Sequence, residues 1–271
     1  MDGITHIASA FNDAHAAGHA ALMPYLTLGY PEPMLSLSLV EAAANAGADL
    51  IELGVPFSDP LADGPTIQHS TQVALAQGMN VARCLDFTSK LRCRGVTQPL
   101  MLMGYCNPLL SYGLERFVKD AVQAGADGLI VPDLPPAEAQ VLESACREQH
   151  LGLVYLASPN TKPERLALLA QRTTGFLYLV SVMGVTGARN NLSVDLPAFV
   201  KRSKSGANTP VAVGFGIATP EQAARVGALA DGVIVGSALV NAIDASMDDP
   251  IQGVLKYVGS LASALNVRDS K

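Results

Sequence analysis

Two carboxylates that are 11 residues apart are the side chains in this sequence best suited to acid/base chemistry. Glu52 lies in Asp49-Leu-Ile-Glu-Leu-Gly-Val55, where an otherwise apolar strand would bury it near its carboxyl end. Burial disfavours the charged form and raises the pKa of a carboxyl group, so Glu52 could both give and take a proton near neutral pH. A structural glutamate paired with backbone or with an arginine is the alternative, and the pattern leaves both open.

A loop rich in proline follows Glu52 and carries the second carboxylate, Asp63. The segment Pro56-Phe-Ser-Asp-Pro-Leu-Ala-Asp-Gly-Pro65 contains three prolines and a glycine, which restrict the backbone without forming a helix or a strand. A rigid loop of this kind can bring Asp63 to the pocket that holds Glu52. Asp63 or Asp59 could instead form a turn or cap the helix that is expected after the loop.

Two strand ends rich in glycine predict a phosphorylated small-molecule substrate. They read Val211-Ala-Val-Gly-Phe-Gly-Ile217 and Val233-Ile-Val-Gly-Ser-Ala238, the second at an expected helix start. Glycine permits close approach of the backbone, and N–H groups at a helix N-terminus bind an anion without lysine or arginine. Glycines that only form tight turns would give the same pattern. Gly184-Val-Thr-Gly-Ala-Arg-Asn-Asn191 has the composition of a lid, in which Thr186 could bond the Asp63 loop, or of an inert surface loop.

Eight short apolar segments are expected to be the strands that position these residues. They are Met23–Leu28, Leu50–Gly54, Leu100–Gly104, Gly128–Val131, Leu153–Ala157, Phe176–Val180, Val211–Gly214 and Gly232–Val235. Segments with helical periodicity lie between them, at Met34–Ala46, Thr66–Gln77, Leu114–Ala124, Pro136–His150, Pro163–Arg172 and Pro220–Val226. Continuous apolar strands that alternate with helices are typical of a parallel sheet covered by helices. Eight such units predict an α/β fold, a single (β/α)8 TIM barrel.

The whole chain, residues 1–271, is expected to form this single TIM-barrel domain, since no linker divides it. Residues 1–18 are expected to form an extra N-terminal helix that closes the barrel bottom, and Asp248–Val267 a final helix. The interval between Gly54 and Leu100 is too long for one helix, so it is expected to hold a functional loop before its helix.

A repeated segment supports the barrel. Ala46-Gly-Ala-Asp49 and Ala124-Gly-Ala-Asp127 share one pattern, with a looser copy at residues 227–231, and each predicts a corner between a helix and the next strand. In such a barrel the site lies where the strands end. Besides Glu52, the residues expected there are Tyr25, Thr27, Tyr105, Pro132, Asp133, Tyr155, Tyr178, Ser181, Gly214, Phe215, Gly216, Gly236 and Ser237.

Charge and composition disfavour several kinds of partner and chemistry. The 18 Lys and Arg residues against 24 Asp and Glu residues give a net charge of -6, which argues against nucleic acid. No apolar stretch approaches the ~20 residues that span a membrane, and the N-terminus lacks a secretory signal, so a cytoplasmic location is expected. No lysine lies in a predicted strand, and the histidines form no cluster with carboxylates, so neither Schiff-base chemistry nor a metal site is expected. Neither dinucleotide-binding nor P-loop motifs are present.

The segment Leu53-Gly-Val-Pro-Phe-Ser-Asp-Pro-Leu-Ala-Asp-Gly-Pro-Thr-Ile-Gln68 closely resembles the signature of the tryptophan synthase alpha subunit family. The resemblance covers nearly the whole chain, through Pro24–Gly29, Met103–Pro108, Tyr112–Phe117, Asp127–Asp133, Gly184–Gly187, Gly214–Ile217 and Gly236–Ser237. It implies a lyase that cleaves indole-3-glycerol phosphate to indole and glyceraldehyde 3-phosphate by a retro-aldol reaction without a cofactor. It also implies a beta subunit in an alpha2beta2 assembly, which alone carries pyridoxal phosphate and docks on the loops at Pro56 and Asn107–Leu110.

The same resemblance implies the role of each site residue. Glu52 would protonate C3 of the indole and take the proton of the adjacent hydroxyl, while Asp63 would stabilise positive charge at the indole nitrogen. Tyr178 matches the family's tyrosine beside the catalytic acid, and Thr186 its lid threonine. The remaining predicted substrate-binding residues are Gly187, Gly216, Gly236 and Ser237 around the phosphate, Phe215 and Met103 as apolar walls, and Tyr25 and Gly214.

Three alternatives stay open. A phosphosugar isomerase of the same barrel type would share the phosphate site but perform enolisation, and the loop around Asp63 argues against it. A stand-alone lyase that releases free indole would use the same chemistry without a partner. A barrel that has lost catalysis could serve as a binding or regulatory module, but the presence of both Glu52 and Asp63 argues against that.

Overall fold

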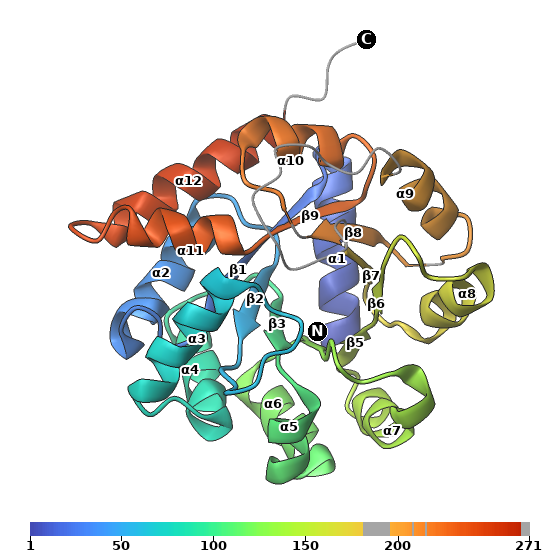
Figure 1. Cartoon of the computed structure of the whole chain (residues 1–271), viewed down its shortest axis with the longest axis horizontal. Helices are drawn as coiled ribbons and strands as arrows, with labels where there is room; N and C mark the ends of the chain where they lie inside the picture. Colours follow the sequence, from blue (N-terminus) through green and yellow to red (C-terminus); the bar gives the residue numbers. More distant parts are fainter. Residues whose placement is uncertain (181–195, 208, 215, 267–271) are drawn as a thin grey trace.

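A computed structural model describes residues 1–180, 196–207, 209–214 and 216–266, and it confirms the α/β barrel (Figure 1). The strands of the described residues are all parallel and form one nine-stranded sheet in the order β5-β4-β3-β2-β1-β9-β8-β7-β6. Their bounds are β1 Ala21–Thr27, β2 Ile51–Gly54, β3 Leu100–Met103, β4 Gly128–Ile130, β5 Gly152–Val154, β6 Leu156–Ala157, β7 Leu177–Val180, β8 Val211–Gly214 and β9 Gly232–Val235.

The ninth strand arises because the predicted strand Leu153–Ala157 is interrupted at Tyr155. Its first part, β5, pairs with β4, and its second part, β6, pairs with β7. The Tyr155 carbonyl still accepts the N–H of Tyr178 on β7 at 3.0 Å. The two pieces therefore join the ends of the sheet, and the barrel is the predicted eight-stranded ring with one interrupted strand.

Helices surround the strands and cover their outer face (Figure 1). The helices cover the outward-facing residues of the strands, and the inward-facing residues fill the barrel interior. Every residue of the strands β1 to β5 is therefore buried, which explains why these strands are mostly continuous apolar runs. The helices of the described residues are α1 Gly3–Ala16, α2 Pro33–Asn45, α3 Pro65–Ala76, α4 Val81–Cys93, α5 Cys106–Tyr112, α6 Leu114–Ala124, α7 Gln140–Glu148, α8 Pro163–Arg172, α9 Leu196–Lys204, α10 Pro220–Gly227, α11 Ser237–Asp244 and α12 Pro250–Leu265. None of these described helices is long and apolar enough to cross a membrane.

Three helical segments differ from the sequence prediction. The interval between β2 and β3 holds a second helix, α4, whose first turn is capped by Asn80 Oδ1 accepting the N–H of Arg83 at 3.0 Å. Asn107–Leu110, expected to be a loop, lies within α5, because Asp133 Oδ1 accepts the N–H of Cys106 at 2.9 Å and stabilises the helix start. The predicted helix Pro136–His150 is a 3-10 turn at Pro136–Glu138 followed by α7.

The helix α1 lies at the end of the barrel where the strands begin, as the sequence predicts. Ile7 is fully buried against the first residues of β4 and β5. A Cβ atom would come within 3.1 Å of its Cδ1 at Gly128 and within 2.7 Å at Gly152, so glycine at both positions makes room for this side chain. On the next turn of the helix, Phe11 packs on Phe176 with ring centroids 5.5 Å apart.

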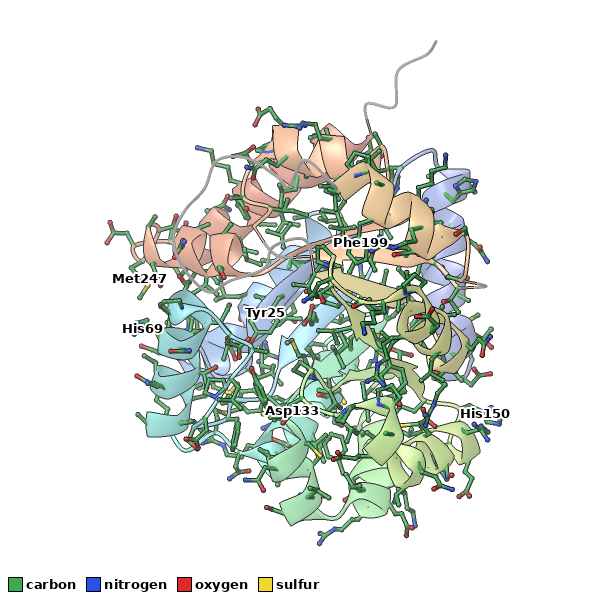
Figure 2. The ribbon with its side chains drawn as sticks, turned by 45° about the vertical axis from the view of Figure 1, so that its right-hand side comes forward. Tyr25, His69, Asp133, His150, Phe199 and Met247 are labelled. Carbon is green, nitrogen blue, oxygen red and sulfur yellow. The ribbon has the colours of Figure 1, made fainter. Side chains whose placement is uncertain are left out.

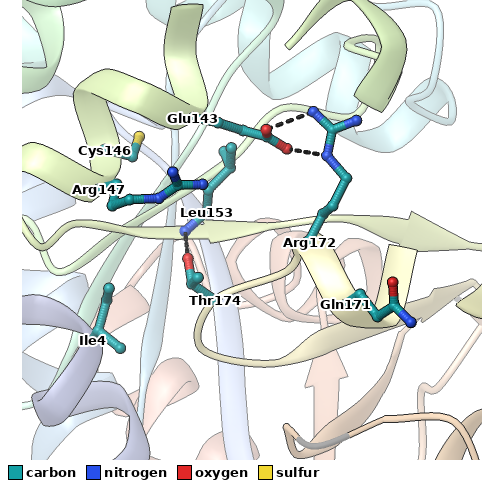
Figure 3. Close-up of a pocket in the computed structure, with 8 residues that line it drawn as sticks. All are labelled: Ile4, Glu143, Cys146, Arg147, Leu153, Gln171, Arg172 and Thr174. Carbon is teal, nitrogen blue, oxygen red and sulfur yellow. Dashed lines mark hydrogen bonds and ion pairs between the residues drawn. The ribbon is translucent and has the colours of Figure 1, made fainter. Parts of the chain in front are cut away.

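The repeated Ala-Gly-Ala-Asp corners share one hydrogen-bonding arrangement. In each, the aspartate that precedes a strand uses Oδ2 to accept an N–H at the start of the previous strand. Asp49 accepts from Leu22 at 2.8 Å, Asp127 from Leu100 at 2.8 Å, and Asp231 from Val211 at 2.9 Å. Thr174 does the same with its hydroxyl toward Leu153 at 2.8 Å (Figure 3).

Candidate active site

Glu52 is held inside the barrel as the second of the four residues of β2. Its side chain is 1% exposed, and Oε2 is buried with no hydrogen-bond partner among the described residues. Burial, and secondarily the negative charge of Asp63, raises the pKa of Glu52 to about 8. A glutamate that only stabilised the fold would have both oxygens paired, so a buried oxygen without a partner favours a group that meets a ligand or exchanges a proton.

Asp63 reaches the same interior from the proline-rich loop, as predicted. Burial raises its pKa to about 6, and a hydrogen bond from the Tyr105 hydroxyl opposes that rise. The Tyr105 oxygen also accepts the N–H of Ala62 at 3.0 Å, and Gln68 Nε2 donates to the Asp63 carbonyl at 2.9 Å. Tyr105 was expected at a strand end but was assigned no role, and the structure shows that it holds Asp63 in place.

Tyr25 and Tyr178 each lie over a glycine of the neighbouring strand. A Cβ atom at Gly54 would come 2.1 Å from the Tyr25 hydroxyl, and one at Gly214 would come 2.4 Å from the Tyr178 hydroxyl. In both cases the glycine is two residues beyond the tyrosine's partner in register, so both hydroxyls point toward the carboxyl ends of the strands. Figure 2 shows Tyr25 among the strands in the interior.

These tyrosines share the barrel interior with the two carboxylates. Burial raises the pKa of Tyr25 and of Tyr178, and the negative charges of Glu52 and Asp63 raise both further. Met103, the last residue of β3, is buried beside them in register with Gly54. The structure thus brings together residues predicted from four different strands and one loop.

The glycines predicted to bind phosphate lie at the ends of two neighbouring strands. Gly214 ends β8, and Gly216 has a φ of 76°, a left-handed conformation that favours glycine. Gly236 follows β9, and Ser237 is the first residue of α11, as the sequence predicts. The first N–H groups of a helix have no partner within it, so they can bind an anion here.

Several other residues predicted for the site lie elsewhere in the barrel or outside the described residues. Thr186, Gly187, Phe215 and Ser181 lie outside the described residues. Tyr155 points away from Glu52 and Asp63, because its hydroxyl donates to Glu143 on α7 at 2.6 Å.

A separate pocket of about 240 Å³ contains neither carboxylate of the predicted site. Figure 3 shows its lining, from α1, α7, β5 and the end of α8. Its main polar groups are already paired, since Arg172 Nε donates to Glu143 at 2.7 Å and Thr174 binds the Leu153 N–H. No cluster of three or more potential metal ligands is found in the parts of the chain that the structure describes.

The fold and the site define a TIM-barrel enzyme with two buried acids of unlike surroundings near the carboxyl ends of its strands. Comparison with known proteins agrees. The family model described as "Tryptophan synthase alpha chain" matches residues 11–266. The tryptophan synthase alpha chain of Roseiflexus castenholzii is 51% identical over 243 residues, covering 90% of this chain and 93% of the relative. That of Chloroflexus aurantiacus is 46% identical, covering 97% of this chain and 99% of the relative.

Solved structures give the same answer. A structure of Mycobacterium tuberculosis tryptophan synthase has a TM-score of 0.89 at 40% identity, covering 96% of this chain and 98% of that chain. The alpha chain from Legionella pneumophila has a TM-score of 0.90 at 37% identity over the full length of both chains. The chain belongs to the tryptophan synthase alpha chain family. It is a lyase that acts on indole-3-glycerol phosphate in tryptophan biosynthesis, and its family name implies a beta-chain partner.

Proposed function

We propose that Glu52 is the acid and the base of the lyase reaction and that Asp63 stabilises the charge that develops on the indole. The support for these two roles is that the two carboxyl groups lie in different surroundings and have different pKa values. Glu52 has a pKa of about 8, so it is protonated at pH 7, whereas Asp63, with a pKa of about 6, is mostly ionised. Such a separation between two neighbouring acids is typical of a site in which one donates a proton and the other supplies negative charge.

The proposed reaction needs no group beyond these side chains. Protonated Glu52 delivers its proton to C3 of the indole, and the positive charge that appears on the ring nitrogen is stabilised by the Asp63 carboxylate. Ionised Glu52 then removes the proton from the hydroxyl on the adjacent carbon. The carbon–carbon bond breaks, its electron pair returns to the indole ring, and an aldehyde forms. Glu52 is protonated again at the end, so no cofactor is required.

Binding of the substrate would use both ends of the site. The phosphate would lie on the backbone of Gly216, Gly236 and Ser237 together with Gly187, where N–H groups and the α11 dipole favour negative charge. The indole would lie near Met103, Phe215 and Gly214, with Tyr25 and Tyr178 toward the reacting carbon. One buried oxygen, Glu52 Oε2, carries the proposal, because no described residue pairs with it to explain its burial.

We also propose that the chain assembles with its beta chain as an alpha2beta2 complex in the cytoplasm. Pyridoxal phosphate would be carried only by the beta chain. Two large apolar side chains support a docking face near the site: Leu61 on the proline-rich loop is 86% exposed and Leu110 on α5 is 56% exposed. A stand-alone lyase remains the alternative, and its indole release would be unchanged on adding a beta chain.

The test is an indole-release assay on the purified alpha chain and its carboxamide variants. Glu52→Gln and Asp63→Asn should each keep the fold, seen as an unchanged circular dichroism spectrum, and lose about 100-fold or more in kcat, since each removes one proton transfer or one charge. Asp248→Asn, an exposed carboxylate far along the chain, is the matched control and should keep full activity. Turnover of Glu52→Gln near that of the unmodified chain would refute the assignment.

A further inference from the structure

Three buried hydroxyl groups form a chain that runs from α3 to the interior of the barrel. Ser70 Oγ on α3 lies 2.7 Å from Oγ1 of Thr27, the last residue of β1. Thr27 Oγ1 lies 3.3 Å from the Tyr25 hydroxyl oxygen. At the other end, Ser70 Oγ lies 2.9 Å from the carbonyl oxygen of Ile67. All three hydroxyl-bearing residues are buried, so the chain is shielded from solvent.

Packing fixes the Tyr25 ring independently of this chain. The hydroxyl occupies the space above Gly54 that a side chain would otherwise fill. Tyr25 is also the partner of Glu52 in the β1–β2 register, and Glu52 and Gly54 face the same side of β2 because they are two residues apart. The phenol oxygen therefore lies above Gly54, in the interior that also holds Glu52, whose negative charge raises the pKa of Tyr25. The hydroxyl chain has only to set the direction of the phenol proton.

The chain can run in two directions, because each hydroxyl has one proton and can also accept. In the first, Tyr25 donates to Thr27, Thr27 to Ser70, and Ser70 to the Ile67 carbonyl, so the phenol presents lone pairs to the barrel. In the second, Ser70 donates to Thr27, Thr27 donates to Tyr25, and the phenol proton points into the barrel. The first arrangement suits a protonated neighbour, and the second suits a carboxylate.

We propose that Thr27 and Ser70 are positioning residues whose hydrogen bonds reverse when Glu52 loses and regains its proton, so that Tyr25 can accept from the acid and donate to the base. The inference rests on the proposed role of Glu52, which must exist in both forms in each turnover. Asp63 from the loop, Tyr25 from β1 and Tyr178 from β7 are the titratable groups around Glu52. Variants of Thr27 and Ser70 leave all of them in place.

The experiment is a titration of the Glu52 carboxyl carbon by ¹³C NMR on the full-length chain, with Glu52→Gln identifying the signal. Tyr25→Phe removes the donor to the carboxylate, the stronger of the two bonds, so the pKa of Glu52 should rise by about 0.5–1 unit. Thr27→Val removes the acceptor of the phenol proton, which leaves the phenol only as a donor, so the pKa of Glu52 should fall by about 0.5 unit. Ser70→Ala should act in the same direction as Thr27→Val, because a buried Thr27 proton would lose its acceptor.

Two matched controls separate this effect from general loss of buried hydroxyls. Thr88 donates to the Cys84 carbonyl and Ser203 to the Phe199 carbonyl, both at 2.9 Å and both fully buried on helices. Thr88→Val and Ser203→Ala should leave the pKa of Glu52 unchanged. In the Tyr25→Phe background, Thr27→Val should have no further effect, since the chain acts through the phenol.

The inference is overturned if Thr27→Val leaves the pKa of Glu52 unchanged, raises it, or lowers it equally with and without the Tyr25 hydroxyl. Opposite shifts in Tyr25→Phe and Thr27→Val support it. The indole assay on Glu52→Gln distinguishes the two proposals. If Glu52→Gln loses indole release but the pKa shifts are absent, only the proposal on the hydroxyl chain is wrong. If Glu52→Gln retains indole release, the proposed role of Glu52 itself is wrong.

Discussion

Glu52 and Asp63 are chemically similar groups that the barrel places in different surroundings. Burial raises the pKa of both, but the Tyr105 hydroxyl donates to Asp63, while Glu52 Oε2 has no partner among the described residues. The charge of Asp63 also raises the pKa of Glu52. In the proposed reaction, this difference in surroundings would separate the acid from the counter-charge.

Tyr105→Phe tests the support of Asp63. Loss of the hydrogen bond should raise the pKa of Asp63 above about 6, so the acidic limb of the kcat/KM profile should move to higher pH. A decrease of about tenfold in kcat/KM at pH 7 is expected, because the loop also loses the acceptor of the Ala62 N–H. Tyr112→Phe removes a hydroxyl that donates to Asp120 at 2.7 Å and should leave the acidic limb in place. An unmoved limb in Tyr105→Phe would show that the hydroxyl does not support Asp63.

The residue types and spacing pointed to Glu52 and Asp63, because a carboxylate in an apolar strand and another in a rigid loop are visible in the sequence. The structure buries both side chains, and their roles stay predictions. Tyr105 and the Thr27–Ser70 contact were not predictable in the same way. The two members of each contact lie 43 residues apart, and their meeting depends on strand register and on the path of α3. Register and helix placement are tertiary properties that a single sequence does not display.

At the level of helices and strands, the aspartates that precede the strands make the clearest stabilising contacts. Asp127 Oδ2 accepts the N–H of Leu100, and the same carboxylate forms an ion pair with Arg92 at 2.5 Å and a hydrogen bond with His6 Nδ1 at 2.8 Å. Asp231 similarly combines the Val211 N–H with Lys204 at 2.7 Å. The aspartate of the repeated sequence therefore makes the same polar contact between neighbouring strands each time. Turn propensity alone explains the glycine of the repeat but not the aspartate.

Asp127→Ala should lower the free energy of unfolding by about 2–4 kcal/mol, because it leaves a buried N–H without its acceptor and removes the counter-charge of a half-buried guanidinium. Urea denaturation followed by circular dichroism measures the change. Asp86→Ala removes an exposed pair with Lys90 and should cost less than about 1 kcal/mol. Indole release by folded Asp127→Ala should equal that of the unmodified chain, since the site lies at the opposite end of the strands. Equal stability of the two variants would contradict the role of the corner.

Strands and their order were the most predictable part of the fold, and short helices the least. All eight apolar segments became strands, because burial on both faces requires continuous apolar runs. The helix α5 was missed because its start depends on Asp133, 27 residues away, and not on a local cap. Tyr155 interrupts its strand through another distant contact, since its N–H donates to the Thr173 hydroxyl at 3.2 Å and not to a neighbouring strand.

Across the whole molecule, the two ends of the barrel serve different purposes. Where the strands begin, carboxylates are paired with N–H groups and cations, and α1 covers the opening. Where the strands end, the two carboxyl groups have raised pKa values, and Glu52 Oε2 has no partner in the part of the chain that the structure describes. An unpaired buried acid makes the folded state bind a proton more tightly than the unfolded chain does. The site therefore reduces the stability of the molecule as the pH rises.

Glu52→Gln should make the fold more stable than the unmodified chain at pH 9 and should give little gain at pH 4.5. The pKa of Glu52 is raised from 4.5 to about 8, so its stabilising contribution is complete below pH 4.5 and is lost as the pH rises through about 8. The shift sets an upper bound of about 5 kcal/mol on the gain. Urea denaturation of both proteins at pH 4.5, 7 and 9 measures it. A difference that does not grow with pH would show that Glu52 is not buried with a raised pKa.

The most direct test of the two-acid site is the pH dependence of kcat/KM for indole release by the alpha chain. Activity requires ionised Asp63 and protonated Glu52, so the profile should be bell-shaped, with an acidic limb near pH 6 and an alkaline limb near pH 8. Full activity that persists to pH 10 would contradict a protonated Glu52 as the donor to the indole carbon.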